Sequence, residues 1–238
     1  MDRKIIVITD MRSREAGDAV PYLQDEGYDV RPVPEEVCLW DEEAVRSWVE
    51  PFKSEIAGII HPAPPVTVAG IEEITEEMWA KNANEGPVAA LIVTKVFGQI
   101  LRENGGGAII YLNSIHAEKP LGRGYLFSMD AGAVQMLCRE FAQDHACFNV
   151  RPYFVMRGPS EEESFAKNDL TSLYFGMDMR YSSRKMPEKG YLNPLLSFLL
   201  SEDAAPLVGS DVKAEGGYTG FYGNHHYMTE GRAYEQRK

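Results

Sequence analysis

A serine and a histidine two residues apart, Ser114 and His116, follow an apolar segment of the chain. Histidine exchanges protons near neutral pH, so His116 could act as a general base beside the serine. A partly buried loop histidine that bonds only to the backbone is the alternative. His61 also follows an apolar segment. Open α/β sheets bind ligands at the carboxyl ends of their strands, so we expect these three side chains to converge there.

The segments that would position these residues are short apolar runs, as in strands buried on both faces of a parallel sheet. The predicted strands cover residues 5–8, 28–33, 57–60, 108–112, 149–155 and 208–214, and residues 37–40 could form one more. The predicted helices cover residues 41–52, 72–80, 87–101, 132–146 and 195–200. The alternation predicts an α/β fold, namely a Rossmann-like doubly wound parallel sheet in a three-layer α/β/α arrangement.

Length and charge limit the domain count and the partners. The 238 residues predict a single domain over residues 1–238, with an irregular lid region at residues 160–191 and a C-terminal tail at residues 218–238. The net charge of −12 repels phosphates, so we expect no nucleic acid and no membrane as partner. No targeting segment precedes the first predicted strand, which predicts a cytoplasmic protein. Three scattered cysteines indicate neither disulfides nor a metal site.

Several segments, in this order along the chain, resemble the short-chain dehydrogenase/reductase family. They are residues 6–16 (first strand and glycine-rich turn), 60–64 (the Asn-Asn-Ala-Gly turn), 110–114 (the strand that ends in the catalytic serine), 198–201 and 209–217. Within the family, the chain is most similar to the halohydrin dehalogenase branch. That likeness rests on residues 16–20, 27–30, 119–121 and 204–209. The resemblance implies the same fold, and in that branch an anion site replaces the nicotinamide.

The glycine-rich turn of the family is the first departure. Its three glycines, which let backbone amides approach a pyrophosphate, correspond to Asp10, Arg14 and Ala16. Pro21 disfavours a helix that begins early in this segment, so we expect the first helix to begin near Asp18. That start would draw the helix N-terminus away from the phosphate position. Arginines in this turn could hold an anion instead, or be solvated surface residues.

The catalytic positions are the second departure. The resemblance implies that Ser114 is the catalytic serine, that the tyrosine corresponds to Phe127, and that the lysine corresponds to Ala131. The dehalogenase branch uses a Ser-Tyr-Arg triad, whose arginine also corresponds to Ala131. Phenylalanine cannot exchange a proton and alanine carries no charge, so neither the reductase triad nor the dehalogenase triad is present. Tyr125 is a candidate substitute for the tyrosine, with a surface tyrosine as the alternative. Arg157 could contact an anionic substrate.

These departures predict an atypical family member without a working nicotinamide site. The expected catalytic residues are Ser114, His116 and Tyr125, and the expected substrate-binding residues are His61, Phe127 and Arg157. We expect no cofactor and no metal. The favoured function is a cofactor-independent lyase, hydrolase or isomerase acting on a small polar or carbonyl molecule. The alternatives are a catalytically inactive binding or scaffolding subunit, and an NAD(P)-dependent oxidoreductase with unusual cofactor contacts.

One further segment predicts assembly. The predicted helix over residues 87–101 is apolar on nearly all sides, and such a helix is usually covered by protein on both sides. We therefore expect a homo-oligomer, a tetramer or a dimer. The family has an asparagine in a helix of this region. Asn82 and Asn84 lie on either side of the corresponding position, and the sequence does not decide between them. Asp130 is adjacent to Ala131, the position that corresponds to the lysine. Because adjacent helical residues point about 100° apart, Asp130 should face away from the site.

Overall fold

The computed structural model describes residues 4–120, 122–159, 181–182 and 187–220. The chain divides into two compact units. The larger unit comprises Met1–Arg157 and Glu188–Ala214 and contains the sheet, and the smaller comprises Gly158–Pro187 and Glu215–Lys238. The predicted lid region and C-terminal tail lie mostly outside the described residues, and the single-domain assignment stays a prediction.

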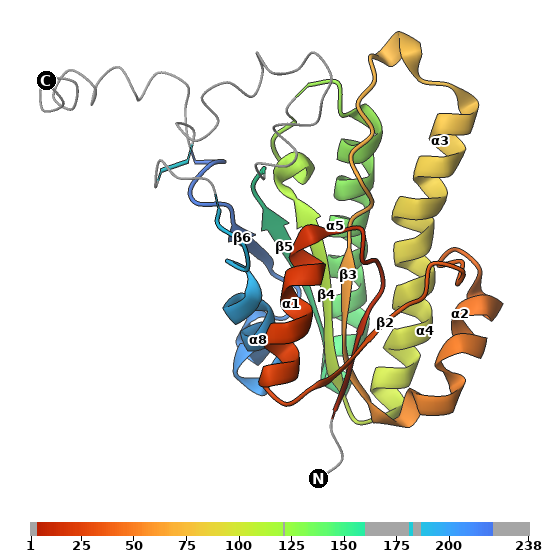
Figure 1. Ribbon diagram of the computed structural model, residues 1–238, viewed down its shortest axis with the longest axis vertical. Helices are drawn as coiled ribbons and strands as arrows, with labels where there is room; N and C mark the ends of the chain where they lie inside the picture. The colour runs from red at the N-terminus through yellow and green to blue at the C-terminus, as the bar shows by residue number, and fades with distance from the viewer. Residues whose placement is uncertain (1–3, 121, 160–180, 183–186, 221–238) are drawn as a thin grey trace, which may run out of the picture. The chain divides into compact units, whose positions relative to one another are not determined.

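The larger unit is built on six parallel strands in the order β2-β1-β3-β4-β5-β6. The strands are β1 (Ile5–Ile8), β2 (Asp29–Pro32), β3 (Ile56–Pro62), β4 (Gly107–Ser114), β5 (Val150–Arg157) and β6 (Asp211–Ala214). The chain runs from β1 to β2 on one side and then to β3 on the other side of β1. The strand order therefore reverses between β1 and β3, and doubly wound sheets bind ligands at such a point. The carboxyl ends of the six strands lie toward the top of Figure 1.

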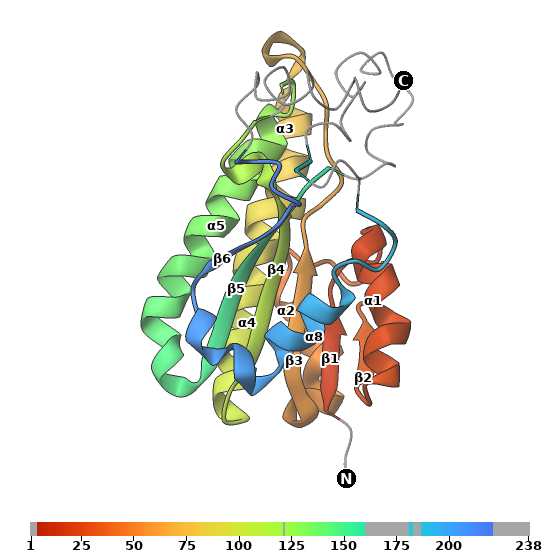
Figure 2. The ribbon, with the colours of Figure 1, turned by 90° about the vertical axis from the view of Figure 1, so that its left-hand side faces the viewer.

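Helices cover both faces of this sheet. They are α1 (Arg14–Asp25), α2 (Glu42–Val49), α3 (Glu76–Ala83), α4 (Ala89–Glu103), α5 (Tyr125–His145) and α8 (Asn193–Leu200). The helices α1 and α8 pack together on one face, and α2, α4 and α5 lie on the other (Figure 2). The predicted Rossmann-like, three-layer α/β/α fold is confirmed. Asp41 caps α2, since its side chain accepts the backbone N–H groups of Glu43 and Ala44.

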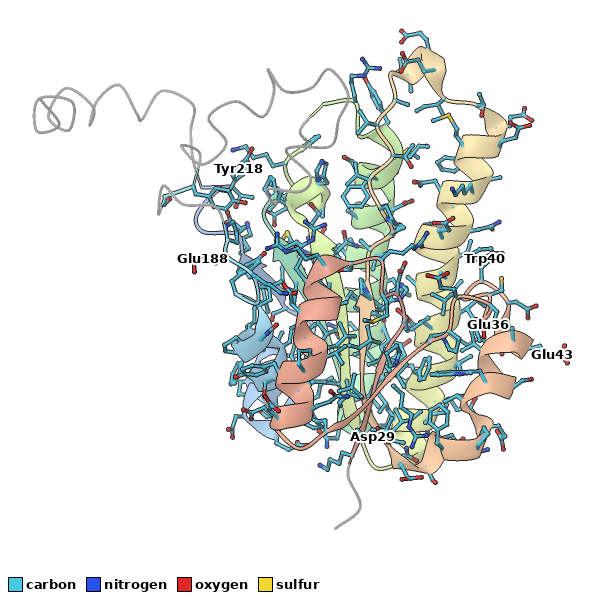
Figure 3. The ribbon with its side chains drawn as sticks, in the orientation of Figure 1. Asp29, Glu36, Trp40, Glu43, Glu188 and Tyr218 are labelled. Carbon is cyan, nitrogen blue, oxygen red and sulfur yellow. The ribbon has the colours of Figure 1, made fainter. Side chains whose placement is uncertain are left out.

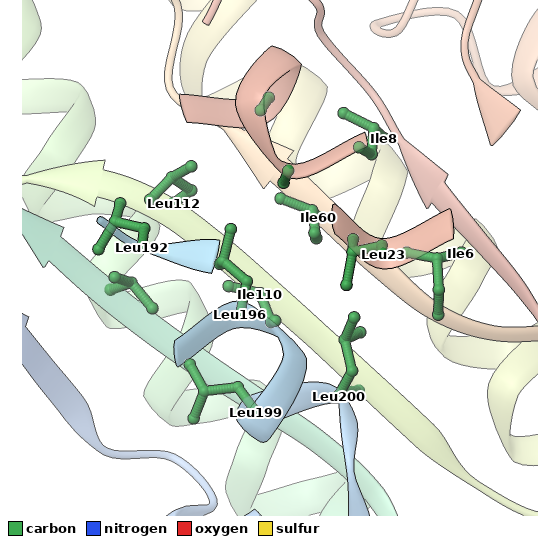
Figure 4. Packing of buried hydrophobic residues seen from close by; sticks show 14 of the residues in the cluster. Ile6, Ile8, Leu23, Ile60, Ile110, Leu112, Leu192, Leu196, Leu199 and Leu200 are labelled. Carbon is green, nitrogen blue, oxygen red and sulfur yellow. The ribbon is translucent and has the colours of Figure 1, made fainter. Parts of the chain in front are cut away.

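The core explains why the strands were predictable. All four residues of β1 are buried, as a strand covered on both faces requires. On one face, side chains of β1, β3 and β4 pack against α1 and α8 (Figure 4). The labelled members of this cluster are Ile6, Ile8, Leu23, Ile60, Ile110, Leu112, Leu192, Leu196, Leu199 and Leu200. The apolar segment 195–200 in α8 therefore covers this face of the sheet together with α1.

Two predictions about the first third of the chain are wrong. The first helix begins at Arg14 and not near Asp18, because the side chain of Ser13 caps it by accepting the backbone N–H of Ala16. Pro21 is tolerated inside the helix, whose apolar face packs on the sheet. Residues 37–40 are not a strand. They form turns, with the backbone N–H of Val37 bonded to the carbonyl of Pro34.

The described part of the smaller unit is held by contacts among its own residues. The Tyr181 hydroxyl donates a hydrogen bond to the carbonyl of Pro159. The rings of Tyr181 and Tyr218 meet edge to face, with centroids 5.3 Å apart. Glu215 accepts the backbone N–H and the hydroxyl of Thr219. These contacts fix the residues that follow β6 into a compact turn.

Candidate active site

Ser114 and His116 form a hydrogen-bonded pair at the carboxyl end of β4. Ser114 is the last residue of the strand, and its Oγ lies 2.9 Å from Nδ1 of His116. The same Oγ caps the short 3₁₀ turn Ile115–Ala117, and the side chain of Asn113 accepts the Ser114 backbone N–H at 2.8 Å. Ser114 is buried and His116 is half-buried. The structure therefore brings this hydroxyl and imidazole together at this edge of the sheet, and their catalytic roles stay a prediction.

The Phe127 ring packs against one side of this serine–histidine pair. It lies in the first turn of α5, is 1% exposed, and meets the His116 imidazole edge to face at a centroid distance of 5.0 Å. Gly124 lies against the other part of the imidazole, since a Cβ there would be 3.5 Å from its ring. Ala131 is also buried, one turn further along α5. An apolar wall therefore adjoins the serine–histidine pair where the resemblance implied a tyrosine and a lysine.

Tyr125 starts α5 and is 46% exposed. Residues two positions apart on a helix point about 200° apart. Phe127 faces His116, so the Tyr125 side chain points away from that pair. The structure does not bring Tyr125 to Ser114.

His61 is buried within β3 and bonded to the neighbouring strand end. Its Nδ1 lies 2.7 Å from Oγ1 of Thr9, and burial lowers its pKa to about 4. The ring is therefore neutral at neutral pH. In the sheet register His61 pairs with Tyr111, three residues before Ser114. At about 3.3 Å per residue, His61 lies roughly 10 Å short of Ser114 along the strands, so the two predicted site histidines are not brought together.

Arg157 ends β5 and pairs with Ser114 in the sheet register, so its backbone adjoins the serine. Its side chain reaches toward α1, where Nε lies 3.8 Å from a carboxylate oxygen of Glu15. Glu15 is itself buried beneath the start of α1. This pair joins the end of β5 to the helix that follows β1 and crosses the carboxyl edge of the sheet.

A buried carboxylic acid on α5 was missed from the sequence. Asp130 is 4% exposed, and its Oδ2 accepts a hydrogen bond from the Asn82 side chain at 2.6 Å. Gly86 lies against it, within a π-helical turn between α3 and α4, and π turns are frequent at functional sites. Burial raises the Asp130 pKa to about 7, although Asn82 opposes the rise. Of the two candidate asparagines, Asn82 and not Asn84 therefore has the side-chain amide that points inward, toward Asp130.

A cavity of about 370 Å³ opens beside the ends of β1 and β2. Its walls are Thr9–Arg12, the turns after β2, and one residue of the π-helical turn. The lining residues are Thr9, Asp10, Met11, Arg12, Val33, Pro34, Glu35, Glu36, Val37, Cys38, Leu39, Trp40 and Glu85. Figure 3 shows Glu36 and Trp40 on this segment between β2 and α2. Residues 37–40, for which the sequence allowed a strand, therefore line a cavity beside the switch point.

Within the described ranges, no group of three or more His, Cys, Asp or Glu side chains is arranged to hold a metal ion. No helix in that part of the chain has the length and apolar character needed to cross a bilayer.

A doubly wound parallel sheet with polar groups and a cavity at its carboxyl edge defines a Rossmann-like fold, and sequence comparison identifies the family. The profile of the family described as Enoyl-(Acyl carrier protein) reductase matches residues 5–219. The chain belongs to this family of short-chain dehydrogenases/reductases, which confirms the family resemblance. The narrower likeness to halohydrin dehalogenases stays a prediction.

Individual relatives are distant but span most of the chain. An uncharacterized oxidoreductase of Thermotoga maritima is 21% identical over 219 residues, covering 90% of this chain and 87% of its own. Dehydrogenase/reductase SDR family member 4 of Homo sapiens is 24% identical over 223 residues, covering 89% and 77%. The crystal structure of a gluconate 5-dehydrogenase from Burkholderia cenocepacia, in complex with NADP and tartrate, shares the fold. Its TM-score is 0.80 at 16% identity, covering 93% of this chain and 97% of that one.

These findings overturn the function that the sequence favoured. The matching family profile is that of a reductase, and the relatives are named as an oxidoreductase and a dehydrogenase/reductase. A cofactor-independent lyase, hydrolase or isomerase is therefore the wrong expectation. The error came from treating the lost glycines, tyrosine and lysine as the loss of a function. The NAD(P)-dependent alternative agrees better with the family.

Proposed function

We propose that the protein is a nicotinamide-dependent oxidoreductase that interconverts a small alcohol and the corresponding carbonyl compound, with unusual contacts to its cofactor. The observation that carries the proposal is the hydrogen bond between Ser114 and His116 at the end of β4, in a chain that belongs to an oxidoreductase family. This pair supplies a hydroxyl to hold a substrate oxygen and an imidazole to exchange its proton.

The cavity beside β1 and β2 supports a dinucleotide as cofactor. Its volume of about 370 Å³ lies within the usual range of small-molecule sites, and it adjoins the switch point of the sheet. The turns after β2, including Trp40, would hold the adenosine end, and Glu35 or Glu36 the ribose hydroxyls. Arg12, the one cation among the residues described as lining the cavity, would meet the pyrophosphate. These side chains can hold the group, which would supply the hydride donor or acceptor when bound, in competition with the Asp10 carboxylate at Arg12.

The proton chemistry is assigned to the chain's own residues. Phe127 cannot ionise, so the proton that an alcohol must lose passes to the Ser114–His116 pair. Ser114 Oγ orients the substrate oxygen, and the hydrogen bond to His116 Nδ1 lets the imidazole take up or release the proton. Phe127 excludes water from one side of the imidazole and fixes its plane. Arg157, level with Ser114 in the sheet, would attract an anionic group of the substrate.

The charges of the cavity favour NAD(H) over NADP(H). Glu35 and Glu36 line the cavity where the chain leaves β2, and a carboxylate there suits ribose hydroxyls but repels a 2′-phosphate. We therefore expect NADH to bind more tightly than NADPH.

The test is reduction of a panel of small aldehydes and ketones, followed by NADH absorbance. Ser114→Ala and His116→Gln should each lower kcat/KM by about 100-fold or more, which is typical for loss of acid–base catalysis. His145→Gln is the matched control, because His145 lies in the last turn of α5, stacked on Phe141. Turnover that survives both substitutions would contradict the assignment.

We also propose that the protein is a homo-oligomer that pairs through α5. Tyr125, Met129 and Met136 share one face of this helix and are 46%, 54% and 50% exposed. Gly132 lies between them, and a Cβ there would meet nothing within 4 Å, so a second backbone could approach closely. Monomeric proteins rarely leave such an apolar stripe uncovered.

A further inference from the structure

Arg12, the cation of the cavity, is already engaged by carboxylates of the same chain. Its Nη2 and Nε lie 2.7 and 3.0 Å from Asp10 Oδ2, and Nε also donates to Oδ1 at 3.1 Å. On its other side, Nη1 donates to Glu85 at 2.9 Å. These contacts raise the Arg12 pKa well above its ordinary value, first through the Asp10 hydrogen bonds. The guanidinium is therefore neutralised on two sides.

The carboxylate of Asp10 is held more firmly than the guanidinium. Asp10 Oδ1 also accepts the backbone N–H of Arg12 at 2.8 Å, in the manner of a side chain that closes a turn on itself. The Asp10 side chain is 11% exposed, whereas that of Arg12 is 46% exposed. The carboxylate thus accepts a backbone amide of the β1–α1 turn, the kind of group that binds pyrophosphate in related folds.

Each nearby cation among the described residues faces a carboxylate, and these include Lys81, whose Nζ lies 3.9 Å from Glu85. Arg14 lies 3.8 Å from Asp18, and Arg157 lies 3.8 Å from Glu15. The cavity lining contains Arg12 against four carboxylates, so its formal charge is negative. The two negatively charged phosphates of a dinucleotide would meet the Asp10 carboxylate, which already occupies their position at Arg12.

We infer that Asp10 is an internal competitor of the cofactor: its carboxylate occupies the Arg12 guanidinium that a pyrophosphate would contact, and so it sets a low affinity of the cavity for anionic ligands. This inference rests on the proposed function for the identity of the natural ligand. The competition itself is a property of Asp10, Arg12 and Glu85. Removing the Asp10 charge releases Nε and Nη2 of Arg12, while Glu85 still holds Nη1, and tightens anion binding. Removing Arg12 weakens anion binding.

Asp10→Asn is the sharpest perturbation, since an asparagine oxygen still accepts the Arg12 backbone N–H and preserves the turn. Binding is measured by thermal shift and calorimetry on the full chain, with inorganic pyrophosphate and NADH as separate probes. Asp25→Asn, at the exposed end of α1, makes the same charge change away from the cavity. We expect Asp10→Asn to bind both probes about tenfold more tightly than wild type, and Asp25→Asn to match wild type.

The double variant separates competition for Arg12 from simple repulsion. If Asp10 acts by occupying Arg12, the gain from Asp10→Asn falls below about threefold when Arg12 is already Gln. An equal gain in both backgrounds, or unchanged pyrophosphate affinity in Asp10→Asn, overturns the inference. If Asp10→Asn gains pyrophosphate binding while no variant binds NADH or NADPH, the inference stands and the proposed function fails. If wild type binds NADH and Asp10→Asn binds no more tightly, only the inference fails.

Discussion

Replacing Asp130 with asparagine should remove a large pH dependence of folding stability. Asp130 is buried against Gly86 and accepts a hydrogen bond from Asn82. Burial raises its pKa from 3.8 to about 7 in the folded protein. Between these values the folded chain holds a proton that the unfolded chain has released. Stability from the neutral acid is therefore complete below about pH 4 and is lost as the pH rises through 7.

The magnitude follows from the size of the shift. One pKa unit corresponds to about 1.4 kcal/mol, so the roughly three units at Asp130 limit the effect to about 4 kcal/mol between pH 4 and pH 8. An asparagine has no proton to lose, and it can still accept the Asn82 hydrogen bond through its carbonyl. The variant should therefore lack this loss and be more stable than wild type above pH 7.

The assay is urea unfolding followed by circular dichroism at several pH values from 4 to 8. We expect the difference in unfolding free energy, Asp130→Asn minus wild type, to grow steadily with pH. Asp144→Asn is the control, because Asp144 is exposed on the same helix and its difference should stay nearly flat. Parallel pH profiles for wild type and Asp130→Asn would refute the buried neutral acid.

Three further substitutions test the packing of the site. Gly86→Ala would place a Cβ 2.6 Å from Asp130 Oδ2, so we expect a loss of about 1–3 kcal/mol in chemical denaturation. Thr9→Val leaves the buried Nδ1 of His61 without its hydroxyl partner, and unfolding should become easier by about 1–3 kcal/mol; unchanged stability would mean that this bond is unimportant. Met136→Glu puts a charge in the exposed stripe of α5, and light scattering should then detect a smaller assembly than wild type.

The sheet and the serine–histidine pair could be predicted because their signals are local. A strand buried on both faces is apolar throughout, as residues 5–8 are, and Ser114 and His116 are two positions apart. The start of α1 could not be predicted correctly, because the cost of Pro21 is visible in the sequence whereas the packing of α1 on the sheet is not.

The other polar contacts of the site join residues far apart in the chain. Asn82 and Asp130 are 48 positions apart, and Thr9 and His61 are 52 apart. No local pattern indicates such pairs. His61 was expected at the ligand-binding edge because it follows an apolar run, but β3 extends through it and buries it. The length of β3, which depends on pairing with its neighbouring strands, therefore determines that His61 is buried in the sheet and does not lie at its edge.

Binding of NADH to the wild-type protein tests the central claim most directly. Trp40 lines the cavity and is 42% exposed, so a bound nicotinamide dinucleotide should quench its fluorescence. We predict saturable quenching by NADH that disappears in Trp40→Phe, a matching rise in melting temperature, and weaker effects with NADPH. If millimolar NADH and NADPH change neither the fluorescence nor the melting temperature, the protein is not the nicotinamide-dependent oxidoreductase proposed.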